Sequence, residues 1–353
     1  MDYPIIFRGA ILETNNTPLV VDEVTFKGPL DVGQVLVRIY FSGICGKQIE
    51  EIKGSAGIDP FLPHFLGHEG SGIVVDIGPG VRKVKEGDYV VLHWMKGSGI
   101  NANTPIYERQ GKRVNAGWVT TFNEYGVISE DRVTPIPTDS DMETACLLGC
   151  AVTTGVGVVL NEAKVRPGES TAVVGCGGVG LNAIQAAALA RAFPIIAIDT
   201  RASNLDLAKE LGATHTVLAR RWDVISEIIE ITNGLGVKYV IAATGDPKGI
   251  EIAVNSSSEG GTVFFVGVPP ADSTITIEPL KIHKLRKLVG SYGGGTFPDI
   301  HIPAYLNLHR KGNLDLKKLI TNIVSLDRIN DGIEMLLSGS PGRFVVRMVQ
   351  EYD

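Results

Sequence analysis

The chain has 353 residues, of which 44% are hydrophobic and 20% are charged, and its formal net charge is −6. This length predicts two domains with cores of ordinary size, and the composition is typical of a globular protein. The negative charge gives no reason to expect nucleic acid or an anionic membrane as a partner.

No apolar run approaches the length of a membrane span, and the N-terminus has no basic head followed by an apolar stretch. We therefore expect a cytoplasmic protein without a signal peptide. The chain has four cysteines, too few for a disulfide framework at this length, so metal-binding thiolates are the favoured interpretation. They are Cys45, Cys146, Cys150 and Cys176.

The first part of the chain predicts a partly closed β domain. Residues 1–40 show short alternating strands, and GSGIVVDIG (70–78) and GDYVVLHW (87–94) predict two more. A short helix is expected at KQIEEIKGS (47–55). The polar stretch 95–117 has no period and is expected to form a surface loop.

From about Thr153 onwards, strands alternate with helices, as in a doubly wound parallel sheet. The last segments are expected to return to the first domain. The predicted domains are therefore a discontinuous β domain (1–152 and 293–353) and a dinucleotide-binding domain (153–292). The expected strands are 213–219, 237–245, 261–270, 274–279 and 343–349, and the expected helices are 223–233, 249–261, 303–312 and 328–340.

A glycine-rich turn lies at the start of this second domain. An apolar run ends in GCGGVG, an Ala-rich segment follows, and a second apolar run ends at Asp199. This is strand, turn, helix and strand within about thirty residues, as in a dinucleotide-binding βαβ unit. Gly175 permits the turn, Gly177 lets a pyrophosphate approach, and Gly180 lets the helix pack on the strand. The alternative is an ordinary strand–turn–helix.

Asp199 bears on the choice of cofactor. A carboxylate there accepts hydrogen bonds from an adenosine ribose and repels a 2′-phosphate, which favours NAD over NADP. Arg201 offers a place for that phosphate and keeps NADP as the alternative. The other residues of the loop and strand end expected to contact the cofactor are Gly178, Val179 and Thr200.

Cys45, His68 and Cys150 each lie beside glycines, in SGICG, GHEG and LLGC. Cys₂His with one open position is a ligand set of catalytic zinc. Their spacing alone does not show a site, because a free Cys is usually a small buried hydrophobe and a lone His is usually a hydrogen-bonded structural residue.

Taken together, these motifs resemble the zinc-dependent medium-chain alcohol dehydrogenase family. The resemblance implies a GroES-like β domain and a Rossmann domain, zinc on Cys45, His68 and Cys150, and hydride transfer between NAD(H) and an alcohol or carbonyl. It also implies that the Glu69 carboxylate approaches the metal, the alternative being a structural partner for a basic group. The matching segments are SGICG (42–46), 66–91, FNEY (122–125), 147–159, 173–185, KELGATH (209–215) and VGVPP (266–270).

The resemblance also implies further contacts. Thr154 belongs to the floor of the cleft, Val266 and Val268 line the nicotinamide pocket, and Arg343 reaches the pyrophosphate. The alternative for Arg343 is a solvated surface charge. His93 and Trp94 match a position that lines the substrate pocket in the family.

The sequence departs from the family in three ways: at the proton relay, in the surface loop, and at Gly46, which stands where some members place an arginine on the pyrophosphate. Lys47 replaces the usual Ser or Thr of the proton relay, Gln48 follows where Asp is common, and Glu50 stands where some members have His. We hypothesise that Lys47, its pKa lowered by zinc and burial, shuttles the proton with Glu50 beside it. The alternative is that protons leave through water. Residues 92–122 lack the cysteines of a structural zinc, so one zinc per chain is expected.

The residues His93, Trp94, Lys47 and Glu50 favour a polar substrate, such as a polyol, sugar, cyclitol or amino alcohol. A homodimer or homotetramer is expected, with the sheet extended near residues 274–279. Two alternatives stay open: a zinc-free NADP-dependent quinone or enoyl reductase, and a non-catalytic dinucleotide-binding or redox-sensing protein.

Overall fold

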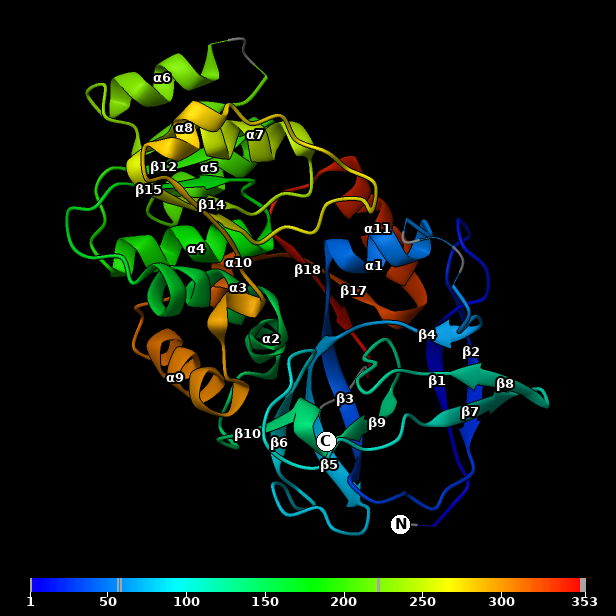
Figure 1. Ribbon diagram of the computed structural model, residues 1–353. Coiled ribbons are helices and arrows are strands. Elements are labelled where there is room, and N and C mark those ends of the chain that lie inside the picture. Colours follow the sequence, from blue (N-terminus) through cyan, green and yellow to red (C-terminus); the bar gives the residue numbers. More distant parts are fainter. Residues whose placement is uncertain (1, 56, 58, 221–222, 350–353) are drawn as a thin grey trace.

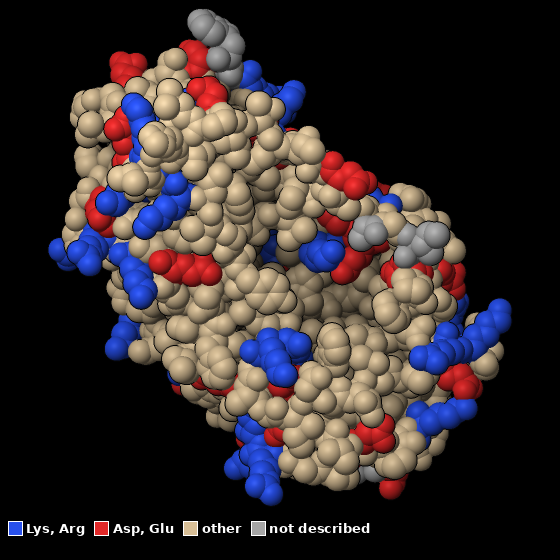
Figure 2. All heavy atoms as spheres, viewed as in Figure 1, with Lys and Arg blue, Asp and Glu red and all other residues tan. Residues whose placement is uncertain are grey.

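A parallel sheet flanked by helices and a β-rich lobe form the two halves of the computed structural model, which describes residues 2–55, 57, 59–220 and 223–349. Figure 1 shows the helix-flanked sheet in green and yellow, with the β-rich lobe in blue and cyan below it. Figure 2 shows that the surface is hollowed where the two halves meet.

The parallel sheet has six strands in the order β13-β12-β11-β14-β15-β16, and every pairing in it is parallel. This confirms the doubly wound sheet predicted from the alternation of strands and helices. Its strands are β11 Thr171–Val174, β12 Ile195–Asp199, β13 His215–Leu218, β14 Val237–Ala242, β15 Ser257–Phe265 and β16 Lys287–Gly290. Its helices are α4 Gly178–Leu189, α5 Ala202–Glu210, α6 Val224–Ile231, α7 Pro247–Ser256 and α8 Pro279–His283.

The strand predicted at residues 274–279 is wrong. Residues 273–278 have no regular structure, and the edge strand is β16 instead. The backbone N–H of Thr276 donates to the Glu251 carboxylate at 2.7 Å, so its hydrogen bond goes to a side chain and not to a neighbouring strand.

The β-rich lobe contains two units. One is a closed barrel in the order β1-β2-β7-β8-β4, and the other is a sheet in the order β10-β6-β5-β3-β18-β17, with β9 paired to β3. The strands are β1 Ile5–Leu12, β2 Val20–Phe26, β3 Gln34–Ile44, β4 His64–Phe65, β5 Glu69–Ile77, β6 Tyr89–His93, β7 Ile106–Arg109, β8 Lys112–Asn115, β9 Tyr125–Ser129, β10 Val133–Ile136, β17 Ile320–Ser325 and β18 Arg343–Arg347.

The stretch 95–117, predicted as a loop, contains the hairpin β7–β8. Gln110 and Gly111 both have positive φ, 50° and 77°, which forms the tight turn between these strands. The strands have four residues each, so their alternation is too short to stand out from the polar residues around them.

The end of the chain returns to the β-rich lobe, as predicted. Strand β18 pairs antiparallel with β3 and parallel with β17. The proposed domain boundaries, 152/153 and 292/293, stay a prediction.

Buried helical segments join the two halves. All seven residues of α3 Ala151–Gly157 are buried, and one hydrophobic cluster includes Val91 of β6, Leu147, Val156 and Ile184 of α4. This shared core holds the cleft walls together. The remaining helical segments are α1 Gly46–Ile52, η1 Glu130–Arg132, α2 Met142–Ala145, η2 Cys146–Gly149, η3 Val158–Ala163, η4 Gly293–Gly295, α9 Pro298–Arg310, α10 Leu316–Leu319, η5 Leu326–Arg328 and α11 Ile329–Ser338.

Within the described residues, no single helix is long and apolar enough to cross a membrane. One pair, Met142–Gly149 and Ala151–Ala163, passes that test of length and composition only when joined across a bend of 59°.

The glycine turn yields a stability prediction. A Cβ on Gly180 would lie 1.9 Å from the carbonyl oxygen of Gly175, whereas a Cβ on Gly177 meets nothing within 4 Å. Gly180→Ala should lower the free energy of unfolding by roughly 1–3 kcal/mol, because the helix must move away from the strand. Urea unfolding measures this, with Gly177→Ala as the matched control. Equal stability of the two variants would contradict the proposed packing.

Candidate active site

Three segments bring the predicted metal ligands together. Cys45 follows β3 and caps α1, His68 lies between β4 and β5, and Cys150 lies between η2 and α3. One ligand atom from each lies within 4.8 Å of the others. Two thiols and one imidazole at this separation suit a tetrahedral zinc ion with its fourth position open.

The two thiols differ in protonation. The hydrogen bond from Cys150 lowers the pKa of Cys45 well below its ordinary value, and His68 and Arg343 add to this against the effect of burial. The same hydrogen bond, together with burial, raises the pKa of Cys150. The lowered pKa favours the thiolate of Cys45, the form that binds metal.

Gln48 is a residue of this site for which the sequence gave no role beyond its departure from Asp. Its side chain is fully buried, its Oε1 accepts from the backbone N–H of Cys45 at 2.8 Å, and its Nε2 contacts Nδ1 of His68. Gln48 thus contacts two of the three ligand residues. One sequence signal could have identified Gln48. It is a polar residue three positions after Cys45, which directly follows a strand.

Glu69 and Arg343 form a buried ion pair behind the ligands. The side chain of Glu69 is 0% exposed and that of Arg343 is 5% exposed. Glu69 Oε2 also accepts from the backbone N–H of Ala151 at 3.2 Å, next to Cys150. The alternative in which Arg343 is a solvated surface charge is therefore wrong. Glu69 is the partner of a basic group, and its approach to a metal stays a prediction.

Arg343 also reaches the glycine-rich loop. A Cβ on Gly178 would lie 2.2 Å from Cδ of Arg343. A side chain at position 178 would therefore displace the side chain of Arg343. Beside it, Gly177 faces open space, and Gly175 has a φ of +94°. Val179 follows in the first turn of α4. The loop therefore leaves room for a pyrophosphate at the N-terminus of this twelve-residue helix.

At the end of β12, Asp199 is oriented by two backbone groups. Its Oδ2 accepts from the N–H of Cys176 at 2.7 Å and its Oδ1 from the N–H of Arg201 at 2.9 Å. Thr200 is exposed beside it. The guanidinium of Arg201 lies against Gly339 at the C-terminal end of α11, where a Cβ would be 1.9 Å from Arg201 Cζ.

The sequence predicts three further residues beside the nicotinamide. Thr154 is 7% exposed, and its buried Oγ1 has no hydrogen-bond partner among the described residues. Val266 is half-buried and Val268 is 70% exposed at the end of the sheet. An orphaned hydroxyl in a buried position calls for a ligand, and an amide group would satisfy it.

Trp94 lies at the metal site. Its buried indole N–H has no hydrogen-bond partner among the described residues, and Trp94 lowers the pKa of the Cys150 thiol against the larger opposing effects. Its ring meets that of Tyr292 edge-on at 4.9 Å, and Tyr292 is 76% exposed. These two rings connect the metal ligands to the surface. Tyr292 was missed because it matches no quoted motif.

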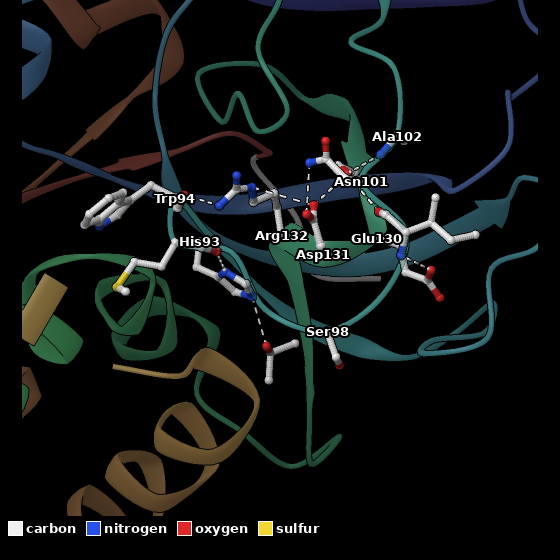
Figure 3. Close-up of polar contacts among 12 residues, drawn as sticks. His93, Trp94, Ser98, Asn101, Ala102, Glu130, Asp131 and Arg132 are labelled. Carbon is white, nitrogen blue, oxygen red and sulfur yellow. Dashed lines mark hydrogen bonds and ion pairs between the residues drawn. The ribbon is translucent and has the colours of Figure 1, made fainter. Parts of the chain in front are cut away.

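His93 is not a pocket residue, and this prediction is wrong. It is 1% exposed, its Nδ1 donates to the carbonyl of Met95 at 2.7 Å, and its Nε2 contacts Oγ1 of Thr134 at 2.9 Å. Figure 3 shows His93 turned inward and the Trp94 ring turned the other way. His93 is the last residue of β6 and Trp94 follows the strand, so the two neighbours need not face the same side.

The segment that follows β6 is held by buried carboxylates (Figure 3). Glu130 accepts from the backbone N–H groups of Arg82, Lys83 and Ile100 at 2.6–2.8 Å. Arg132 donates to the carbonyl of Trp94 at 2.6 Å. These bonds fix the backbone on which Trp94 stands.

Lys47 and Glu50 are arranged differently from the hypothesis. The Lys47 side chain is 45% exposed and not buried as the hypothesis supposed, and its Nζ lies 4.0 Å from Oε1 of Glu51. Glu50 lies 3.8 Å from Lys53. The carboxylate beside Lys47 is therefore that of Glu51, one residue later, because positions four apart share a helix face. Burial raises the pKa of Glu51.

His93 yields a prediction of pH dependence. Burial lowers its pKa from 6.5 to about 3, so between these values the unfolded chain binds a proton that the folded chain does not. The free energy of unfolding should fall by about 2 kcal/mol from this group between pH 7 and pH 5. His93→Gln should lose that part of the pH dependence in urea unfolding. An unchanged slope in the variant would contradict this account.

Two family models match the chain. An alcohol dehydrogenase GroES-like domain matches residues 31–138, and a zinc-binding dehydrogenase domain matches residues 178–307. Among curated proteins, the chain is 32% identical to an S-(hydroxymethyl)glutathione dehydrogenase of Escherichia coli O139:H28. The match covers 96% of this chain and 99% of that protein.

Solved structures agree with this match. A zinc-binding alcohol dehydrogenase domain protein from Burkholderia ambifaria superposes with a TM-score of 0.91 at 27% identity, covering 99% of this chain and 100% of that one. Benzyl alcohol dehydrogenase from Acinetobacter calcoaceticus superposes with a TM-score of 0.89 at 27% identity, covering 98% and 100%.

Proposed function

Because the chain belongs to the zinc-dependent medium-chain alcohol dehydrogenase family and is an oxidoreductase acting on alcohols, we propose that it holds one catalytic zinc on Cys45, His68 and Cys150 and uses NAD. The observation that carries this proposal is the convergence of the three ligand atoms within 4.8 Å of one another. Members of this family use zinc and a nicotinamide cofactor.

Bound zinc would act as a Lewis acid toward the alcohol or carbonyl oxygen in the open position. The protein supplies the arrangement around it. Cys45 offers a thiolate, the buried N–H of Trp94 faces the sulfur of Cys150, and Glu69 lies behind with its charge balanced by Arg343. Thr154, whose buried Oγ1 has no hydrogen-bond partner among the described residues, would be one of the residues that hold the nicotinamide.

The arrangement around Asp199 supports NAD over NADP. Its carboxylate stands at the strand end with both oxygens facing backbone N–H groups, where a 2′-phosphate would be repelled. Arg201, the possible partner for such a phosphate, packs on Gly339.

The proton leaves through Lys47 or through water. The Lys47 Nζ is half-exposed and lies near Glu51, so a proton held at that nitrogen has direct access to solvent. Proton transfer through Lys47 therefore stays one of two proposed routes, and transfer through water is the other. The carboxylate beside Lys47 in the first route is Glu51 and not Glu50.

For the substrate, we propose an alcohol with a flat apolar group next to its hydroxyl-bearing carbon. Trp94 and Tyr292 offer aromatic surface between the metal ligands and solvent, and such faces stack on planar groups. Benzyl alcohol dehydrogenase, one of the similar structures, is named for a substrate of this kind. The polar substrate predicted from the sequence loses the support of His93 and Glu50, and stays the alternative.

We further propose a homodimer or homotetramer that uses the edge strand β16, in which Val289 is 38% exposed, and Leu285 just before it, which is 78% exposed. The cytoplasmic location stays a prediction from the sequence.

The function is tested by mixing the purified protein with NAD and a panel of alcohols and following reduction of NAD. We expect turnover that a chelator removes and zinc restores. Turnover that survives complete removal of metal would contradict the proposed role of zinc.

Asp199→Asn should change the cofactor preference. The amide keeps the shape of the side chain but removes the charge, so the ratio of kcat/KM for NAD to that for NADP should fall about tenfold or more. Asp206→Asn, at an exposed position on α5, is the matched control and should keep the ratio. If the two variants behave alike, Asp199 does not select the cofactor.

Trp94→Ala should lower kcat/KM selectively for aromatic alcohols. We expect kcat/KM for benzyl alcohol to fall about tenfold, since an aromatic pair contributes about 0.5–1.5 kcal/mol beyond the buried area. The value for a small polyol should change less. A larger loss for the polyol would favour the polar substrate instead.

A further inference from the structure

Gln48 is the one residue that contacts two of the three metal ligands through its side chain, among the contacts of the described residues. It lies three positions after Cys45 on α1 and is 0% exposed, so its amide is shielded from bulk solvent. One end of its amide faces Cys45 and the other faces His68.

The hydrogen bonds fix which end of the amide is which. A backbone N–H can only donate, so the group that faces Cys45 N at 2.8 Å must be the oxygen of Gln48. The NH₂ group therefore faces Nδ1 of His68. Because an amide NH₂ also only donates, Nδ1 must accept, and the ring proton of a neutral His68 lies on Nε2.

This tautomer opposes metal binding. Nδ1 is occupied by Gln48, so Nε2 is the nitrogen left to face Cys45 and a zinc ion. A ligating imidazole nitrogen must carry a lone pair, and its other nitrogen then normally donates a proton to a carboxylate or carbonyl. In the observed orientation the oxygen of Gln48 faces the N–H of Cys45 and its NH₂ faces His68, so no acceptor of Gln48 faces Nδ1.

We propose that Gln48 is a positioning residue that sets the tautomer of His68. As a result, the site binds zinc less tightly than it would with a carboxylate at position 48. Glutamate has the same shape with two acceptor oxygens, one for Cys45 N–H and one for Nδ1–H of His68. This inference rests on the proposed zinc site.

The first test is the dissociation constant of zinc, measured by competition with a chromophoric chelator. Gln48→Glu should bind zinc 10- to 100-fold more tightly than the wild type. Changes in residues that hydrogen-bond to metal ligands typically alter metal affinity by this factor. Mere damage to the fold would weaken binding. The matched control is Gln185→Glu on α4, where Gln185 Oε1 accepts from Asp315 N at 2.7 Å and Nε2 has no partner. Its zinc affinity should equal that of the wild type.

The second test needs no metal. Nitrogen-15 NMR of the metal-free protein at pH 8, with His68 assigned by substitution, should show the proton on Nε2 in the wild type and on Nδ1 in Gln48→Glu. A proton on Nδ1 of the wild type would overturn the inference, as would unchanged or weaker zinc binding in Gln48→Glu. If the wild type binds no zinc at all, the proposed function fails instead.

Discussion

The buried ion pair between Glu69 and Arg343 is the constraint on which the arrangement of the site depends. Glu69 begins β5, immediately after His68, and its other oxygen holds the backbone next to Cys150. Arg343 comes from β18 near the end of the chain and lies against Gly178 of the glycine-rich loop. One pair of charges therefore fixes two metal ligands relative to the cofactor loop. Because both side chains are buried, removing either partner would leave an uncompensated charge, which typically costs about 3–5 kcal/mol.

This pair also explains why the chain must return to its first lobe. Strand β18 joins β3, the strand that ends at the Cys45 segment, and so delivers Arg343 to the centre of the molecule. The glycine at position 178 completes the contact, since any side chain there would displace the arginine. Hydride transfer needs the two reacting carbons in contact, and a fixed distance between the metal ligands and the loop provides this.

The sequence predicted those features that depend on local pattern. Glycines at 175, 177 and 180, the strands around them and Asp199 all follow from turn geometry and periodicity, and the structure has them in place. The ligand set could be suggested from residue types, but only the fold could bring Cys45, His68 and Cys150 within 4.8 Å of one another.

Features that depend on which way a side chain turns were not predictable. His93 and Trp94 are neighbours, yet one is buried in the core and the other faces the Cys150 thiol. Glu50 and Glu51 are likewise neighbours, and a single step around α1 decides which lies near Lys47. A shift of one residue exchanges which of two neighbouring side chains faces the site. At the end of a strand or in a helix of two turns, the sequence pattern is too short to decide between them.

Cys45, His68 and Cys150 are proposed to hold one catalytic zinc together. X-ray absorption at the zinc K-edge of the purified protein tests this proposal most directly. We predict two sulfur ligands at about 2.3 Å and nitrogen or oxygen ligands at about 2.0–2.1 Å, with one sulfur lost in Cys150→Ser. A zinc shell of nitrogen and oxygen alone, or one that Cys150→Ser leaves unchanged, would contradict the account.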